Sequence, residues 1–406
     1  MEDCVFWIWL QQALGIGSIK TDWVIRELGS PEKLYQMTDQ ALAATGRFAP
    51  KEIERIRGSS LEEARWQQDR AKRLGCAVVT PDHPAYPASL TNIDCMPCVL
   101  YVLGELEGIN DELAITMVGT RDCDAYGIST AQHLGYGLAT VGATVVSGLA
   151  VGIDTAAHEG ALQAGGRTIG MLACGMDVGY PQASRRLKRR ILDQGGVLIS
   201  EFPFGVRAYG YHFNVRNRIL SGISAGVVVV QAPETSGALN TARHALSQNR
   251  DVFAVPGQIF DEKMRGCNRL IADGGKMVLG LASILEEYQG RYPPCIRLEK
   301  LSELLEQESR GMVGKIPARV SQKSERPLPA VEKTPTPSGQ LESEQCDLSP
   351  EAAKVFQLLN QQPTDFDTIS YASGLPVARL LAILTELELA DLAEQLPGKR
   401  YIRRAP

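Results

Sequence analysis

The sequence predicts an α/β protein built around a Rossmann-like, doubly wound sheet, with a helical domain before the sheet and a winged helix after it. Two observations predict the sheet. From about residue 76, short apolar runs such as CAVVT, AITMVGT and GVVVVQA alternate with helical segments, and the turns after them are rich in glycine. Continuous apolar strands between helices are typical of a parallel sheet covered on both faces. The expected domains are residues 1–75 (helical), 76–290 (sheet), 291–345 (disordered linker) and 346–406 (winged helix).

The composition is that of a globular protein with two or three domains: 406 residues, 44% hydrophobic and 22% charged. We find no apolar run of the roughly 18 residues that a bilayer span needs, and the first residues are acidic where a secretory signal would be basic. We therefore expect a cytoplasmic protein without a membrane partner. The nine cysteines are widely spread, and the one close pair, Cys95 and Cys98, lacks a second pair to complete a zinc site. We expect reduced thiols, no metal and no cofactor.

The first 75 residues show helical periodicity without strand-like runs. Within them, ALGIGSIKTDWVIREL resembles a helix-hairpin-helix, in which the turn Gly15-Ile16-Gly17 would open a second helix. The amides of such a helix N-terminus can hold a DNA phosphate without reading bases. The alternative is a short turn between two core helices, and the sequence leaves both interpretations open.

Three glycine-rich turns in the centre are expected to meet at the carboxyl edge of the sheet, where ligands of such folds bind. Glycine lets a backbone approach an anion closely, and helix N-termini and arginines supply donors to it. The overall net charge is −5, but residues 117–276 carry 16 Lys and Arg against 12 Asp and Glu. The central segment is therefore net positive although the whole chain is net negative. Together these features predict a phosphate ligand. The turns are Gly119-Thr120-Arg121, Ser147-Gly148-Leu149-Ala150 with Gly152 after it, and Gly175-Met176-Asp177.

Two basic segments strengthen this prediction. In SRRLKRR, which contains Arg185, Arg186 and Lys188, helical spacing stacks like charges whose repulsion an anionic partner would relieve, although a solvated helix face is the alternative. In FNVRNR, the donors from Arg216 to Arg218 follow Phe213, which suits a strand of phosphates with an aromatic ring for stacking. The alternative for these donors is an internal ion-pair hub.

Two possible enzymatic sites have less support in the sequence than the phosphate site. No GxGxxG is followed some 20 residues later by a ribose-binding acid, so a nicotinamide site is not expected. His158 follows Asp154 by one helical turn, which suits either acid/base chemistry or a pair that braces the glycine turn.

Residues 346–406 follow the order helix, helix, turn, helix and basic hairpin, which predicts a winged helix. Its expected recognition helix, residues 376–389, has Arg379 as its one basic residue. The whole module has 6 Lys and Arg against 8 Asp and Glu. Duplex binding needs a basic surface, so a protein-interaction role is favoured over DNA reading.

From roughly Pro81 to Val278 the chain resembles the DprA (Smf) family of DNA-processing proteins in a co-linear series of motifs that includes MVGTR, VSGLAVGIDTAAHEGAL, LISEFPFG, FNVRNRILSGIS and SGALNTARHAL. The resemblance implies a homodimer that binds single-stranded DNA, protects incoming DNA and loads the RecA recombinase in natural transformation, without catalysis. It places DNA-binding positions on Arg121, on the Ser147-Gly148 loop, on Arg185 and on Arg216 to Arg218. The full expected DNA-binding set is Gly119, Thr120, Arg121, Ser147, Gly148, Ala150, Gly152, Arg185, Arg186, Lys188, Phe213, Arg216, Asn217, Arg218, Ser236 and Gly237.

The chain departs from the family pattern at four positions. Thr120 replaces a serine, Asn214 a proline, Gln231 a glutamate and Asn240 an apolar residue. Gln231 and Asn240 could form a compensating pair at the sheet edge. The competing function is that of a nucleotide-binding hydrolase of the lysine-decarboxylase-like Rossmann group, but PETSGALNT, residues 233–241, lacks the paired glycines and final carboxylate of its PGGxGTxxE motif.

Overall fold

The computed structural model forms two compact units, Met1–Val331 and Glu332–Pro406, which are described separately. Within them the structure describes residues 4–288, 290–292, 297–309, 350–359, 364–373, 375, 380, 383–384, 387, 393–396 and 400–403. No helix in these described ranges is long and apolar enough to cross a membrane.

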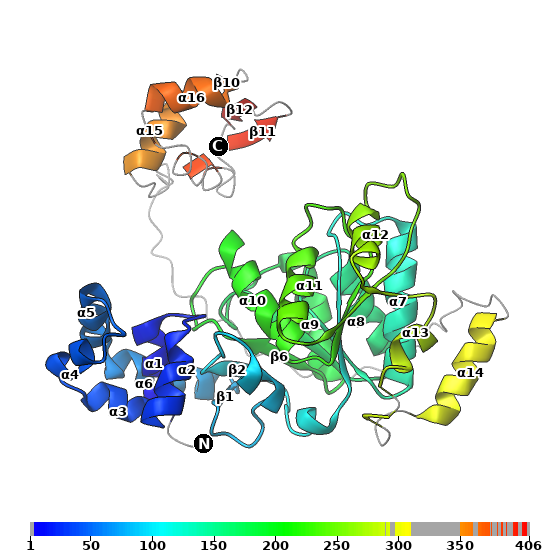
Figure 1. The fold of residues 1–406 in the computed structure, drawn as a ribbon, viewed down its shortest axis with the longest axis horizontal. Coiled ribbons are helices and arrows are strands. Elements are labelled where there is room, and N and C mark those ends of the chain that lie inside the picture. The colour runs from blue at the N-terminus through cyan, green and yellow to red at the C-terminus, as the bar shows by residue number, and fades with distance from the viewer. Residues whose placement is uncertain are drawn as a thin grey trace, which may run out of the picture. The chain divides into compact units, whose positions relative to one another are not determined.

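A mostly parallel sheet lies at the centre of the first unit, as the alternating apolar runs predicted (Figure 1). In the described part of the chain its order is β1-β2-β6-β5-β4-β3-β7-β8-β9. All neighbours are parallel except β1–β2 and β2–β6, which are antiparallel. The strands are β1 (Ala77–Val79), β2 (Leu100–Leu103), β3 (Ala114–Val118), β4 (Thr144–Ser147), β5 (Thr168–Leu172), β6 (Val197–Ser200), β7 (Gly226–Val229), β8 (Asp251–Ala254) and β9 (Lys276–Met277).

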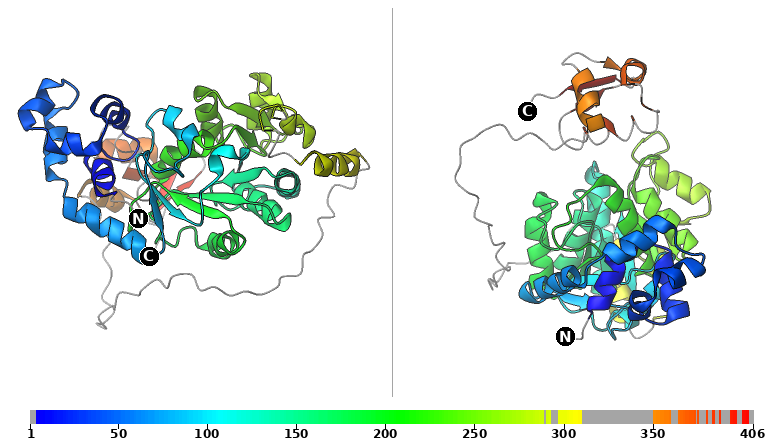
Figure 2. Two further views of the ribbon diagram at one scale, coloured as in Figure 1. Left: turned by 90° about the horizontal axis from the view of Figure 1, so that it is seen from below. Right: turned by 90° about the vertical axis from the view of Figure 1, so that its left-hand side faces the viewer.

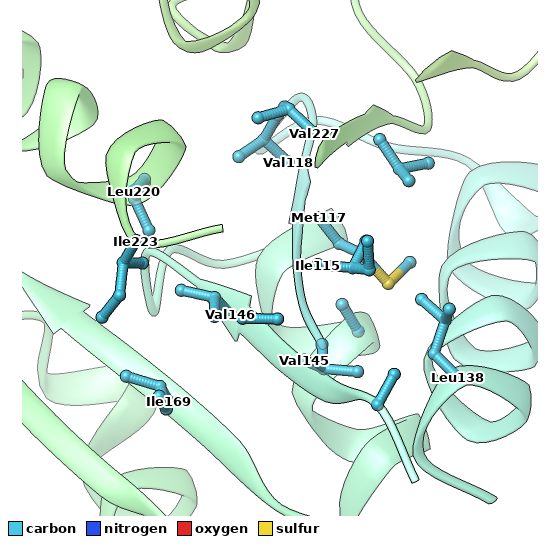
Figure 3. Close-up of a cluster of buried hydrophobic side chains, with 14 of the residues drawn as sticks. Ile115, Met117, Val118, Leu138, Val145, Val146, Ile169, Leu220, Ile223 and Val227 are labelled. Carbon is cyan, nitrogen blue, oxygen red and sulfur yellow. The ribbon is translucent and has the colours of Figure 1, made fainter. Parts of the chain in front are cut away.

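Helices cover both faces of this sheet, so its strands are buried on both sides. In β3, Ile115 and Met117 lie toward Leu138 of α7, while Leu220 and Ile223 of α10 approach the other side (Figure 3). The alternation follows the two-residue period of a strand. The helices around the sheet are α7 (Ala125–Thr140), α8 (Ile153–Gln163), α9 (Arg185–Asp193), α10 (Gly210–Gly222), α11 (Ala238–Ser247), α12 (Arg265–Ala272) and α13 (Ala282–Leu285), with short 3-10 turns at Ala88–Asn92, Ile109–Asp111 and Gln182–Ser184.

The N-terminal helices pack against the β1 end of the sheet (Figures 1 and 2). They share one hydrophobic cluster with it, in which the buried ring of Trp9 belongs to the same set as Tyr101 of β2 and Phe204. The rings of Tyr101 and Phe204 meet edge to face with centroids 5.0 Å apart. The helices are α1 (Val5–Leu14), α2 (Lys20–Trp23), a π-helical turn (Val24–Leu28), α3 (Pro31–Gln36), α4 (Asp39–Ala44), α5 (Pro50–Gly58) and α6 (Leu61–Arg73).

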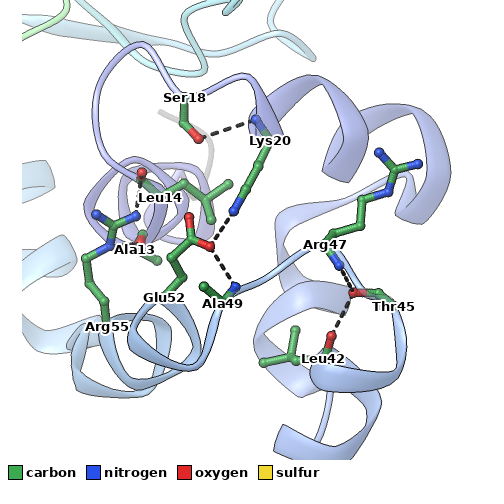
Figure 4. A network of polar contacts seen from close by, with 10 residues as sticks. All are labelled: Ala13, Leu14, Ser18, Lys20, Leu42, Thr45, Arg47, Ala49, Glu52 and Arg55. Atoms are coloured by element: carbon green, nitrogen blue, oxygen red, sulfur yellow. Dashed lines mark hydrogen bonds and ion pairs between the residues drawn. The ribbon is translucent and has the colours of Figure 1, made fainter.

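The Gly15-Ile16-Gly17 turn is half-buried between packed elements. The Arg55 guanidinium donates to the carbonyls of Ala13 and Leu14 at distances of 2.7 and 2.8 Å, so it satisfies the C-terminal end of α1 (Figure 4). A Cβ added to Gly17 would lie 3.8 Å from the Arg218 guanidinium of α10. This environment favours the interpretation of the turn as a link between two core helices over that of a DNA phosphate site.

One segment of the expected disordered linker is instead helical. Helix α14 (Leu298–Ser309) begins just after Arg297, whose backbone N–H donates to the Val141 carbonyl at 2.8 Å. Leu304 is buried in the main core. The leucines of LEKLSELLEQES recur at helical spacing, and this apolar stripe outweighs the polar composition on which the linker prediction relied. The rest of the predicted linker that follows α14, residues 310–345, lies outside the described residues.

The second unit contains the helices and antiparallel strands of a winged helix. Its strand order in the described part is β10-β12-β11, and Val355, Ile369, Leu384 and Tyr401 belong to its core. The expected recognition helix, 376–389, lies mostly outside the described residues. The elements are α15 (Pro350–Leu358), β10 (Thr364–Asp365), α16 (Phe366–Ser373), β11 (Ala393–Leu396) and β12 (Arg400–Arg403).

Candidate nucleic-acid interface

A pocket opens at the carboxyl ends of β3, β4 and β5, the edge at which the sequence placed the ligand. Two of the three predicted turns reach it. The third turn departs from the expectation, because the Asp177 carboxylate accepts from the Gly205 amide at 2.8 Å and lies 3.6 Å from Arg70 of α6, away from the pocket. The pocket is lined by Arg121, Gly148, Leu149, Ala150, Val151, Leu172, Ala173, Tyr180, Pro181 and Phe213.

The pocket is displaced from the topological switch point, which lies between β3 and β7 because the chain winds outward in opposite directions from these strands. Gln231 fills that position. Its backbone carbonyl accepts from the Thr120 amide at 2.7 Å, and its side-chain amide exchanges hydrogen bonds of 3.0 and 3.1 Å with Asp124. Asp124 in turn caps α7 through the Gly127 amide. The site therefore shifts toward β4 and β5.

The expected pair of Gln231 and Asn240 is not formed. Asn240 donates instead to the side chain of Asn214 at 3.1 Å. Asn214 and Asn240 are both departures from the family pattern and are hydrogen-bonded to each other, while the Asn240 Oδ1 also accepts from Arg243. The compensation exists, but it joins Asn240 to a different position from the one that we predicted.

The Gly148 turn is braced from inside by Asp154. The Asp154 carboxylate accepts from the amides of Gly148 and Ala150 at 3.1 and 3.3 Å. These two donors are therefore satisfied within the protein, which corrects the expectation that they face a phosphate. Burial raises the pKa of the Asp154 carboxyl, and the nearby Arg216 guanidinium opposes that shift. Of the two interpretations of the Asp154 and His158 spacing, the structure supports bracing of the turn by Asp154.

Arg216 and Arg218 have internal partners, so the hub interpretation of FNVRNR is favoured and direct phosphate contact is not. Arg216 is 4% exposed and donates to the carbonyls of Gly148 and Met171, which ties the ends of β4 and β5 to α10. Burial lowers the pKa of Arg216 to about 10, so it stays charged at neutral pH. Arg218 lies 2.6 Å from the Glu201 carboxylate, and both side chains are buried. A Cβ at Gly148 would lie 2.7 Å from the Arg216 guanidinium, so a side chain there would displace Arg216 from its carbonyl partners.

Other members of the predicted DNA-binding set also make contacts within the protein. The buried Ser147 hydroxyl donates to the Met117 carbonyl at 2.6 Å, and buried Asn217 donates to the Gly237 carbonyl at 3.5 Å. Gly152 has a φ of +86° and lies against the carbonyls of Thr120 and Arg121, so it shapes the start of α8. Gly119 lies beside Ile153 and the Gln231 carbonyl. Ser236 and Gly237 lie where α11 begins, beyond the residues that line the pocket.

Among the cations of the predicted set, the exposed ones are Arg121, Arg185 and Arg186. Within the described ranges no salt bridge is formed by any of the three. The Arg121 guanidinium lies 5.0 Å from the centre of the Phe213 ring, a cation–π geometry. The Ser184 hydroxyl donates to the Leu149 carbonyl at 2.7 Å, which fixes the start of α9, and hence Arg185, beside the Gly148 turn. Arg121 lines the pocket and Arg185 starts α9 beside it, and we call these two cations the basic rim of the pocket.

The remaining cations of α9 are engaged by the protein itself. Lys188 donates to the Tyr180 carbonyl at 2.6 Å, Arg189 lies 3.8 Å from Asp193, and Arg190 pairs with Glu159 at 2.5 Å. The repulsion that the sequence predicted between stacked arginines is thus relieved partly by carboxylates of the chain. The available positive charge is concentrated at the first turn of the helix.

Sequence reasoning missed Tyr180 as a pocket residue. Its ring meets Phe213 edge to face with centroids 5.9 Å apart. The available signal was an aromatic residue that closely follows the Gly175 turn in the motif GYP. Together with Phe213 it gives the pocket an aromatic wall beneath the basic rim.

His158 is fully buried, and its Nδ1 lies 2.7 Å from the Thr168 hydroxyl. Burial lowers the pKa of His158 to about 3, so the folded protein keeps the ring neutral while the unfolded chain binds a proton near pH 6.5. Stability should therefore fall as the pH drops below 6.5, with His158 contributing a slope of about 1.4 kcal/mol per pH unit.

Urea unfolding of the wild type and His158→Gln between pH 6.5 and 4 measures this contribution. The variant should lose that part of the slope. His83→Gln, at a half-buried histidine, controls for the loss of a histidine as such. An equal slope in wild type and His158→Gln would contradict the assignment.

Comparison with known proteins gives two domain matches. Residues 77–289 match the family model for DNA recombination-mediator protein A, and residues 339–399 match that for the DprA winged helix domain. Among described residues, this agrees with the sheet of the first unit and the elements of the second.

Full-length relatives and a solved structure agree with these matches. Protein Smf of Synechocystis sp. is 31% identical over 404 residues, which are 98% of either chain. DNA processing protein DprA of Streptococcus pneumoniae is 39% identical over 204 residues, 50% of this chain and 71% of the relative. The X-ray structure of that pneumococcal protein superposes with a TM-score of 0.60 at 32% identity, over 71% of this chain and 99% of that one. The chain belongs to the DNA recombination-mediator protein A family, whose members include the DprA and Smf proteins.

Proposed function

We propose that this protein binds single-stranded DNA across the pocket at the ends of β3, β4 and β5, without reading base sequence. The observation that carries the proposal is the combination of Arg121, which lies over the Phe213 ring, with Arg185, which Ser184 holds beside the Gly148 turn. Exposed arginines without carboxylate partners suit phosphates, and the rings of Phe213 and Tyr180 suit bases.

The contact set of the proposal is smaller than the sequence suggested. Arg121, Arg185 and Arg186 contact phosphates, while Arg216 and Asp154 hold the turn in shape from behind. Among the cations of the predicted set, these three are exposed, so binding at the pocket depends on few ionic contacts and on stacking.

The hydrolase alternative would need an acid or base at the pocket. The residues that line it include no Asp or Glu. The nearest buried carboxylate, Asp154, is occupied by two backbone amides and lies close to Arg216. The geometry thus favours binding over hydrolysis.

Fluorescence anisotropy of a labelled oligo-dT strand tests the proposal across a salt series. Affinity should fall linearly with salt on a double-logarithmic plot, with a slope of about −0.7 for each phosphate contacted. An equal-length duplex serves as the control and should bind more weakly. Absence of binding at low salt, together with binding of a nucleotide, would contradict the proposal and favour the hydrolase.

The proposal extends to the role implied by the family resemblance: protection of incoming DNA and loading of RecA during natural transformation, by a homodimer in the cytoplasm. Two pockets on one homodimer would engage the same strand and raise its effective concentration at the second pocket. This supports a protein that coats a strand before handing it on. The winged helix is proposed to contact a protein partner, since residues 346–406 carry 6 Lys and Arg against 8 Asp and Glu and so lack the basic surface that duplex binding needs.

A further inference from the structure

Two large aromatic side chains are exposed at the start of α10. Tyr209 and Tyr211 are 51% and 65% exposed. Their rings are nearly parallel, with an interplanar angle of 10° and centroids 6.2 Å apart. Aromatic rings that leave their faces in water provide apolar area that a flat partner can cover.

A buried residue holds these rings in place. The His212 ring, which follows Tyr211 in sequence, is 5% exposed and meets Tyr209 and Tyr211 edge-on with centroids 5.3 and 4.3 Å away. His212 itself lies against the buried Phe202 ring, with centroids 4.3 Å apart. The tyrosines are therefore oriented before any ligand arrives, which lowers the entropy lost when a ligand stacks on them.

The pair lies next to the proposed strand site. Tyr209 is the N-cap residue of α10 and Phe213 lies in the first turn of the same helix, so the tyrosine pair and Phe213 belong to the same end of α10. Phe213 lines the pocket and lies beneath Arg121. The exposed side chain of Arg207 comes two residues before Tyr209. Arg207 thus adds an exposed cation close in sequence to the tyrosine pair, and such a cation suits a phosphate.

We propose that Tyr209 and Tyr211 form a stacking platform for a nucleobase of single-stranded DNA, one that extends the site beyond the nucleotide held at Phe213 and Arg121. The proposal rests on the proposed function and adds the path that the strand follows. A base carries a π-face whatever its identity, so the platform adds affinity without adding sequence preference.

The test combines affinity and base stacking. Tyr209→Leu/Tyr211→Leu should bind oligo-dT about 5- to 150-fold more weakly, as expected for the loss of stacking by one base. Its salt slope should stay that of the wild type, because no phosphate contact is removed. A strand with 2-aminopurine at successive positions should show quenching at one position in the wild type and recover fluorescence there in the variant.

Three controls make the result decisive. Tyr209→Phe/Tyr211→Phe keeps both rings and should keep wild-type affinity and quenching. Trp66→Leu removes a ring that is 49% exposed on α6 and should leave both unchanged. Thermal melting shows whether the leucine variant remains folded; should it unfold, the Tyr211→Leu single variant, at the more exposed ring, replaces it.

Failure of this proposal is distinguishable from failure of the proposed function. Wild-type affinity and quenching in the leucine variant, while Arg121→Ala loses binding, would overturn the platform and leave strand binding intact. A wild-type protein that binds no strand would overturn both.

Discussion

Replacing Arg218 with methionine is expected to lower the free energy of unfolding by about 3–5 kcal/mol, because it leaves the Glu201 carboxylate buried without its partner. The two groups are 2.6 Å apart, and the exposed fractions of their side chains are 7% and 3%. Burial already raises the pKa of the Glu201 carboxyl, and Arg218 is the main influence that opposes this shift. Urea unfolding of wild type and variant gives the difference.

The pH dependence supplies a second readout of the same change. Without Arg218, Glu201 should take up a proton in the folded state at a higher pH than in the unfolded chain, so the variant loses stability as the pH rises from the unfolded-state pKa to the folded-state pKa. Its deficit should therefore be smaller near pH 5 than near pH 8. The double variant Arg218→Met/Glu201→Leu should recover most of the loss, since apolar replacement of a buried ion pair is often neutral. A single variant as stable as the wild type at pH 8 would show that the pair is not formed.

Arg121→Ala/Arg185→Ala is expected to weaken oligo-dT binding about a hundredfold at moderate salt, since each charge-assisted hydrogen bond to a phosphate contributes at least about 1.5 kcal/mol. The magnitude of the salt slope should fall by about 1.4, or 0.7 for each phosphate that the variant no longer neutralises. The loss of affinity should be the same for all single-stranded sequences, because the arginines bind the DNA backbone. Anisotropy with oligo-dT and a mixed-sequence strand measures both quantities.

A matched variant separates local phosphate binding from net charge. Arg265→Ala/Arg269→Ala removes the same charge from exposed positions of α12, where both arginines are near carboxylates of their own helix or of the residues that flank it. It should bind as the wild type does. Equal losses in the two double variants, or losses that depend on base identity, would argue against phosphate binding at the pocket rim.

The sheet could be predicted because its strands are continuous apolar runs, and the Gly119 and Gly148 turns because glycine and the strand ends coincide. Which of the arginines are exposed could not be predicted from the sequence. SRRLKRR and FNVRNR look equally basic in the sequence, yet Arg185 faces solvent while Arg216 and Arg218 are buried beside carboxylates from distant segments. Charge identifies candidates, but only the tertiary partners Asp154 and Glu201 decide which cations remain available.

Two other differences have the same origin. The partner of Asn240 proved to be Asn214, which is brought close by the packing of α11 on α10 and not by sequence proximity. Helix α14 was not predicted, because polar residues dominate the composition of its segment. The burial of Leu304 depends on a surface formed by earlier elements of the chain. In both cases the prediction differs from the structure because long-range packing, which the local sequence does not reveal, outweighs local propensity.

The cluster that joins Trp9 to Tyr101 and Phe204 has a practical consequence for anyone who cuts this chain into fragments. A fragment that starts at residue 76 would expose the rings of β2 and the Phe204 loop, and one that ends at residue 75 would lose the wall against which its tryptophans pack. Both would be prone to aggregate. Soluble truncations are better sought on the far side of α14, where the second compact unit has a core of its own.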